Sequence, residues 1–133
     1  MQPVSKSKIN NKKSNVVVSN SVTRSAQGLS LVEKRILFCG IAKLGGINQE
    51  ITLTAEEYAN TFDTDLKNAY GQLKKGADSF RKKYLRFQVR DGKAVGTAVV
   101  NWLQGYLYFD KEGYVKFRFS EYITPFLFEL EKE

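Results

Sequence analysis

The chain has 133 residues, of which none is histidine and only one, Cys39, is cysteine. The commonest general base and the commonest metal ligand are therefore missing, and a lone cysteine forms neither a Cys–His pair nor a zinc cluster. Asp63 and Asp65 are better explained as helix N-caps than as a metal pair, and no segment matches a phosphate-binding loop or a dinucleotide fingerprint. We expect a protein that is not an enzyme, with no catalytic residues, no metal and no cofactor.

Long apolar runs are also missing. The longest, around residues 36–45, is far shorter than the roughly 20 residues that span a bilayer. No apolar run of signal-peptide length follows the basic N-terminus. Cys39 has apolar neighbours and no partner for an internal disulfide, which suits a small buried side chain in a reducing compartment. We expect a cytoplasmic protein with no membrane partner.

Acidic residues are absent from residues 1–30, which carry five Lys or Arg. Residues 66–93 carry nine Lys or Arg and only two acids, Asp78 and Asp91, whereas the last residues of the chain are mostly acidic. With a net charge of +7, the chain is expected to present a positive surface that attracts nucleic acid or an anionic membrane. The plain alternative is a solvated basic face that keeps the protein soluble.

The first 18 residues are rich in Ser, Asn and Lys and lack aromatics. We therefore expect a flexible basic arm at 1–18 and one domain at 19–133. Helices are expected at 22–28, from Ser30 to about residue 44, and at 55–62, with a short strand at 50–53. Ser30 and Glu33 are spaced as a capping box, and Gly45 with Gly46 ends the second helix.

Residues 65–83 form the most informative predicted helix. Its apolar residues recur every three or four positions and make one buried stripe, namely Leu66, Ala69, Tyr70, Leu73, Ala77, Phe80 and Tyr84. Residues 84–90 then alternate like a strand and lead into Asp91-Gly92, a hairpin turn signal. Further strands are expected at 95–103, 105–109 and 114–120, before a final helix that starts near residue 120. A basic helix that leads into a basic ribbon is typical of an α+β winged helix, with the ribbon as its wing.

Because the apolar stripe defines the inner side of this helix, its cations point outward and suit phosphate groups. We predict that nine cations of the helix and ribbon bind DNA phosphates, namely Lys67, Lys74, Lys75, Arg81, Lys82, Lys83, Arg86, Arg90 and Lys93. Such binding weakens steeply with salt, because each neutralised phosphate releases a counterion. Base readout is less supported, since flexible lysines dominate. Gly71 and Gly76 inside the helix each cost roughly 1 kcal/mol against alanine, which indicates close approach of a neighbouring element or of DNA.

Several segments resemble the replication initiators of iteron plasmids. Residues 19–26 and 29–37 resemble their opening "N-x-L-x-x-A" and "LS-x-x-E/Q-[QK]-R-[LIM]-L" helices, with Val22 at the usual Leu. Residues 57–62 are similar to their "EYA-x-x-F" helix, and Ala69 to Leu73 to the "A-x-x-x-L" of the next helix. Trp102 and residues 119–127 resemble the late strand and its "[IF]-x-x-YLxPFL" signature. The resemblance covers about residues 19–130 in the same order.

The resemblance implies a DNA-binding initiator built from two tandem winged-helix domains, of which this chain is similar to the first alone. That domain supports dimerisation and contacts the DNA backbone at the origin repeats, so it acts in replication initiation and copy-number control. Expected partners are double-stranded origin DNA, a second copy of the chain and host replication proteins. The density of apolar residues predicts self-association through the late strands and the terminal helix, and specifically through Val99, Val100, Trp102, Leu103, Tyr106, Leu107 and Tyr108. The alternative is that all of these residues pack within one monomer.

Three other functions stay open at this point. One is an autonomous winged-helix transcriptional repressor that binds an operator as a dimer. A second is a protein-interaction module whose basic face docks an acidic replication partner, such as a helicase loader. The third, a small basic nuclease, is weakened by the absence of histidine.

Overall fold

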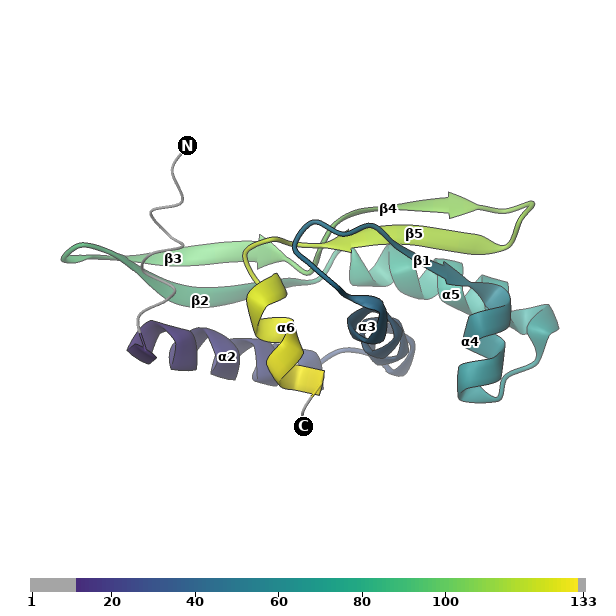
Figure 1. The fold of residues 1–133 in the computed structure, drawn as a ribbon, viewed down its shortest axis with the longest axis horizontal. Helices are drawn as coiled ribbons and strands as arrows, with labels where there is room; N and C mark the ends of the chain where they lie inside the picture. Colours follow the sequence, from purple (N-terminus) through teal and green to yellow (C-terminus); the bar gives the residue numbers. More distant parts are fainter. Residues whose placement is uncertain (1–11, 132–133) are drawn as a thin grey trace.

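The computed structural model describes residues 12–131, which form helices and two antiparallel sheets (Figure 1). In chain order the elements are α2 (Lys12–Gln27), α3 (Leu31–Lys43), β1 (Ile51–Thr54), α4 (Ala55–Phe62), α5 (Leu66–Phe80), β2 (Tyr84–Asp91), β3 (Ala94–Asn101), β4 (Leu103–Phe109), β5 (Tyr114–Phe119) and α6 (Thr124–Glu131). The predicted α+β class is confirmed, and each predicted helix and strand has a counterpart close to its expected position.

The N-terminal helix is longer than the sequence pattern suggested. α2 begins at Lys12, so it takes in residues 12–18 of the segment expected to be a flexible arm. Val18 and Val22, one helical turn apart, are buried where α2 packs against β2 and α6. These two valines give the helix an apolar face that packs against the core. The polar residues around them led to the expectation of a flexible arm. The expectation of a flexible arm at residues 1–11 lies outside the described residues.

Side-chain caps begin three of the helices. Ser30 and Glu33 form the predicted capping box at α3, and Thr54 with Glu57 forms a second one at α4. Asp65 caps α5 by accepting a hydrogen bond of 3.1 Å from the Lys67 backbone N–H. Each cap satisfies backbone donors that the first helical turn leaves unpaired, which explains why the helices start where they do.

The strands form two separate sheets, and this corrects the predicted wing. The larger sheet has the order β1-β5-β4, and β2 pairs only with β3. The hairpin that packs beside α5 as its wing is therefore formed by β4 and β5. The ribbon of β2 and β3 packs against α2 on the other half of the molecule (Figure 1). Strand pairing depends on contacts between distant residues, so the alternating pattern of 84–90 did not reveal which sheet it joins.

Trp102 stands at the junction of the two sheets. Its backbone N–H donates to the Lys83 carbonyl at 3.1 Å, and its own carbonyl accepts from the Ser120 N–H at 2.9 Å. Its ring is buried and lies 5.6 Å from the Phe80 ring, centroid to centroid. One residue thus ties the end of α5 to the ends of β3 and β5, and so fixes α5 relative to both sheets.

Candidate nucleic-acid interface

α5 has one buried side and one exposed side, as its periodicity predicted. Ala69, Leu73, Ala77 and Phe80 are fully buried, whereas Lys67 and Lys75 on the opposite side are exposed. Two residues of the predicted stripe are not buried: Leu66, in the first turn, is 55% exposed, and Tyr84 is 51% exposed because it lies beyond the end of α5, at the start of β2. The helix therefore presents its cations outward, and what each of them contacts decides which are free to bind a phosphate.

Four of the nine predicted phosphate-binding cations form ion pairs with carboxylates. Lys74 lies 3.0 Å from Asp110, and Arg81 and Lys82 lie 3.2 and 3.3 Å from the two oxygens of Asp78. These three pairs are at the surface, where such a pair is worth little and exchanges readily for a stronger anion. The three pairs reduce the electrostatic repulsion between the neighbouring cations of α5, and they leave those cations at the surface.

The fourth pair is different, because its carboxylate is buried. Glu33 is fully buried and accepts hydrogen bonds from the Ser30 backbone N–H, the Ser79 hydroxyl and, at 3.1 Å, the Lys83 ammonium. Burial alone raises the pKa of this carboxyl, but the bonds from Ser79, Ser30 and Lys83 together outweigh it, so the pKa lies below its usual value. Lys83 thus joins α5 to α3, and we assign it a structural role in place of the predicted DNA contact.

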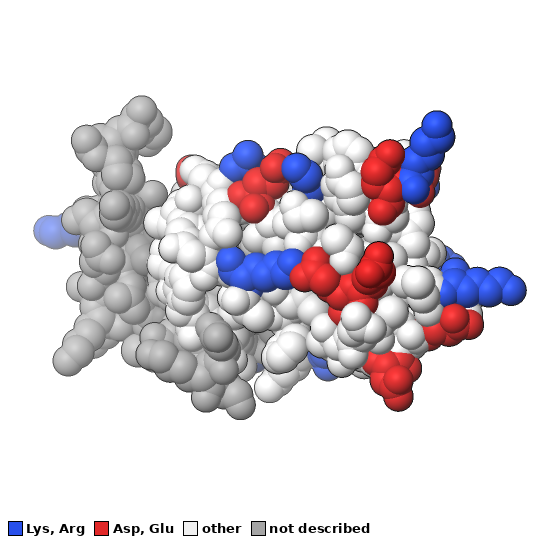
Figure 2. Space-filling view, turned by 45° about the vertical axis from the view of Figure 1, so that its right-hand side comes forward, with Lys and Arg blue, Asp and Glu red and all other residues white. Residues whose placement is uncertain are grey.

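The other five cations have no carboxylate partner within the described residues, and they fall into two groups. Lys67 and Lys75 lie on α5. Arg86, Arg90 and Lys93 lie on the β2–β3 ribbon and its turn, on the opposite half of the molecule (Figure 1). The predicted single surface of helix and ribbon is therefore divided in two. Figure 2 shows the face that turns toward α4 and the wing, where basic and acidic side chains lie next to one another.

The tip of the wing is bound to α5 through Asp110, a residue that the sequence pattern did not single out. Its carboxylate accepts a 2.6 Å hydrogen bond from the Tyr70 hydroxyl and one of 3.0 Å from Lys74. The bond from Tyr70 and then that from Lys74 hold the pKa of Asp110 below its usual value. The Lys74 ammonium also lies 4.2 Å from the centre of the Tyr108 ring. These contacts place the wing beside the flank of α5 that carries Lys67, Lys74 and Arg81.

The predicted self-association residues divide by burial. Trp102 and Leu103 are 1% and 3% exposed and lie in the core of the monomer, so they offer no surface to a partner. Val100 and Tyr106 are half-buried, and the Tyr106 hydroxyl donates to Asp78. Three of the predicted residues are exposed, namely Val99 on β3 and Leu107 and Tyr108 on β4.

The terminal helix is also largely covered within the monomer. Ile123, Phe126 and Leu127 are buried, and α6 packs against α2 and α3. Phe128 is 37% exposed in this helix, and Leu130 is partly buried. The expectation that the apolar C-terminal helix supplies a self-association surface is therefore wrong for most of its side chains, because the core of the monomer uses them.

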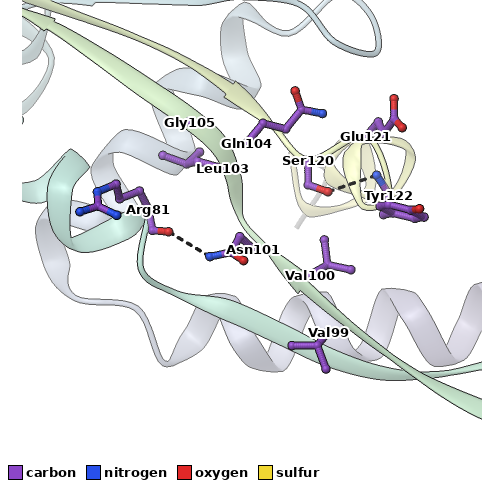
Figure 3. A pocket seen from close by; sticks show the side chains of 10 residues that line it. All are labelled: Arg81, Val99, Val100, Asn101, Leu103, Gln104, Gly105, Ser120, Glu121 and Tyr122. Carbon is purple, nitrogen blue, oxygen red and sulfur yellow. Dashed lines mark hydrogen bonds between the residues drawn. The ribbon is translucent and has the colours of Figure 1, made fainter.

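A groove of about 570 Å³ lies where β3 passes into β4, beside the turn before α6 (Figure 3). Its walls mix apolar and polar side chains, and the Asn101 amide there donates to the Arg81 carbonyl at 3.1 Å. Within residues 12–131 there is no cluster of three metal-ligating side chains. None of the helices described here is long and apolar enough to cross a membrane.

The arrangement of α3, β1, α4, α5 and the β4–β5 wing defines a winged-helix domain. The chain belongs to the family described as "Initiator Replication protein, WH1", whose model matches residues 15–133. The resemblance to plasmid replication initiators is thereby confirmed. A comparison with curated proteins found no matching relative.

The solved structures that share the fold include two replication proteins. The first is the WH1 domain of MSBI1.176, a replication protein isolated from a multiple sclerosis patient, with a TM-score of 0.82 and 23% identity over 89% of this chain and 95% of that one. The second is the Pi initiator protein in complex with iteron DNA, with a TM-score of 0.64 and 19% identity over 82% of this chain. The match covers 48% of the Pi chain, so this chain corresponds to about half of that protein.

Proposed function

We propose that this WH1 domain binds duplex DNA through the phosphate backbone, with α5 and its wing as the contact surface. The observation that carries the proposal is the exposed pair Lys67 and Lys75, two turns apart on one side of α5 and without carboxylate partners in the described part of the chain. Lys74, Arg81 and Lys82 lie beside them in surface pairs that a phosphate replaces at low cost. The Pi initiator, which has the same fold, is known in complex with iteron DNA, and this supports the proposal.

The test compares two double variants of equal charge. Lys67→Gln with Lys75→Gln removes the two free cations of α5, and Arg24→Gln with Lys34→Gln removes two exposed cations of α2 and α3. We expect the α5 variant to bind a labelled duplex about tenfold more weakly than wild type, and the control variant to bind within about twofold. Equal losses in both would mean that net charge, and not α5, governs binding.

We further propose that the domain self-associates through the outer strands β3 and β4. Each has one edge that pairs with no strand of the described chain, and Val99 and Leu107 are 55% and 51% exposed on them. An exposed strand edge with apolar side chains is a template for pairing with another chain. A dimer would place two copies of α5 on one DNA molecule.

Sedimentation velocity tests this second part. We expect wild type to dimerise at tens of micromolar concentration, Val99→Lys to remain monomeric, and Lys111→Gln in the wing turn to behave as wild type. If wild type sediments only as a monomer, the dimer proposal fails while the DNA-binding proposal stands.

In the cell, the proposed role is non-catalytic and cytoplasmic, namely control of plasmid replication initiation and copy number together with host replication proteins.

A further inference from the structure

Gly71 lies in the middle of α5 on its exposed side, where a methyl group would meet no heavy atom within 4 Å. Gly76 in the same helix is different, because a methyl group there would lie 2.3 Å from a methyl carbon of Val32. Glycine disfavours a helix relative to alanine at both positions. The packing of the monomer explains Gly76 and leaves Gly71 without an explanation inside the described chain.

Gly71 also lines a hollow of about 360 Å³ between α5 and β4, together with Lys74, Lys75, Asp78, Tyr106 and Tyr108. The side chains around it are held in place. Lys74 lies over the Tyr108 ring at 4.2 Å, and Tyr106 donates to Asp78 at 2.9 Å. The hollow is therefore a shaped surface in which the missing side chain at position 71 leaves the helix backbone accessible.

The charge around this hollow is positive in balance. Two lysines, Lys74 and Lys75, and one carboxylate, Asp78, line the hollow, which leaves an excess of one positive charge. Hydrogen bonds from Tyr106 and Lys82 lower the pKa of Asp78, so this carboxylate stays ionised, but its charge is offset by ion pairs with Arg81 and Lys82. The site thus suits an anion that approaches close to a helix backbone.

We propose that this hollow is the point of closest approach between α5 and the sugar-phosphate backbone of duplex DNA. A phosphate binds between the ammonium groups of Lys74 and Lys75, and the adjoining sugar packs over Gly71. The proposal rests on the DNA-binding function proposed above and deepens it, since it assigns the contact to one turn of the helix. A side chain at position 71 would hold the backbone away from both lysines.

The experiment uses the full chain with Gly71→Ala and Gly71→Leu, and Asn60→Ala on the exposed side of α4 as the control. All three replace a poor helix former with a good one, so each is expected to raise the Tm by about 2–6 °C. Affinity for a fluorescein-labelled duplex of random sequence is measured by anisotropy at low salt. We expect Gly71→Ala to weaken binding about fivefold and Gly71→Leu more than about twentyfold, with Asn60→Ala unchanged.

Opposite changes in stability and affinity are the signature of this site. A higher Tm with unchanged affinity in both Gly71 variants would show that Gly71 is only a solvated position, and would overturn the proposal while DNA binding itself stands. Equal weakening in Asn60→Ala would overturn it as well, because the effect would then follow from helix stability. If wild type does not bind the duplex, the proposed function fails and this inference fails with it.

Discussion

The carboxylate of Glu33 and the ammonium of Lys83 form an ion pair of 3.1 Å that joins the first turn of α3 to the end of α5. The two residues are 50 positions apart in the chain. Glu33 also completes the capping box of α3 and accepts from Ser79, so one buried carboxylate stabilises a helix start and a helix–helix contact at the same time. The orientation of α5, and with it the direction of its cations, depends on this residue.

Glu33→Ala is expected to lower the free energy of unfolding by about 2–4 kcal/mol, since it removes a cap and leaves buried donors without an acceptor. Urea denaturation of the variant and of wild type measures this loss. Glu56→Ala, which removes an exposed carboxylate from the first turn of α4, serves as the control and should cost less than about 1 kcal/mol. A loss in Glu33→Ala as small as in this control would contradict the assigned role.

The lowered pKa of Glu33 predicts how stability depends on pH. The unfolded chain binds this proton more readily than the folded chain, so the contribution of Glu33 is complete above its ordinary pKa of 4.5 and is lost as the pH falls through the folded value. Wild type should therefore lose stability below pH 4.5 more steeply than Glu33→Gln, which has no proton to bind at this position. Parallel unfolding curves for the two proteins between pH 5 and pH 2 would rule out the linkage.

Gly76→Ala should destabilise the fold, in contrast to Gly71→Ala. The added methyl group would lie 2.3 Å from Val32, so α3 and α5 must move apart, at a cost of about 1–3 kcal/mol. Thermal denaturation measures the effect. The double variant Val32→Ala with Gly76→Ala makes room for the methyl group and should recover part of the loss. No recovery in the double variant would show that the cost arises elsewhere.

Local patterns in the sequence predicted most elements of the fold. The 3.6-residue period of Leu73, Ala77 and Phe80 correctly identified the buried side of α5, and the spacing of Ser30 and Glu33 correctly identified the start of α3. These features depend on residues a few positions apart, so they can be read without knowledge of the tertiary structure.

Contacts between distant residues were beyond such patterns. The alternation of residues 84–90 showed a strand, but its separation from the β1-β5-β4 sheet depends on the turn of the chain at Trp102. Counting charges likewise did not reveal that Asp110, from the wing, pairs with Lys74. The density of apolar residues did not reveal that Trp102 is part of the monomer core. The structure therefore confirms that Lys67 and Lys75 of α5 face outward, and it separates the helix from the β2–β3 ribbon, which we had expected to form one surface. DNA binding by these cations stays a prediction.

The salt dependence of duplex binding tests the central claim most directly. If α5 binds DNA through Lys67, Lys75 and the neighbouring cations, the logarithm of the association constant should fall linearly with the logarithm of NaCl concentration, with a slope of about −2 to −4. Lys67→Gln with Lys75→Gln should reduce the magnitude of that slope by about 2, whereas Arg24→Gln with Lys34→Gln should leave it unchanged. An affinity for duplex DNA that does not change with NaCl concentration, or a slope that the α5 variant leaves as it is in wild type, would contradict the account.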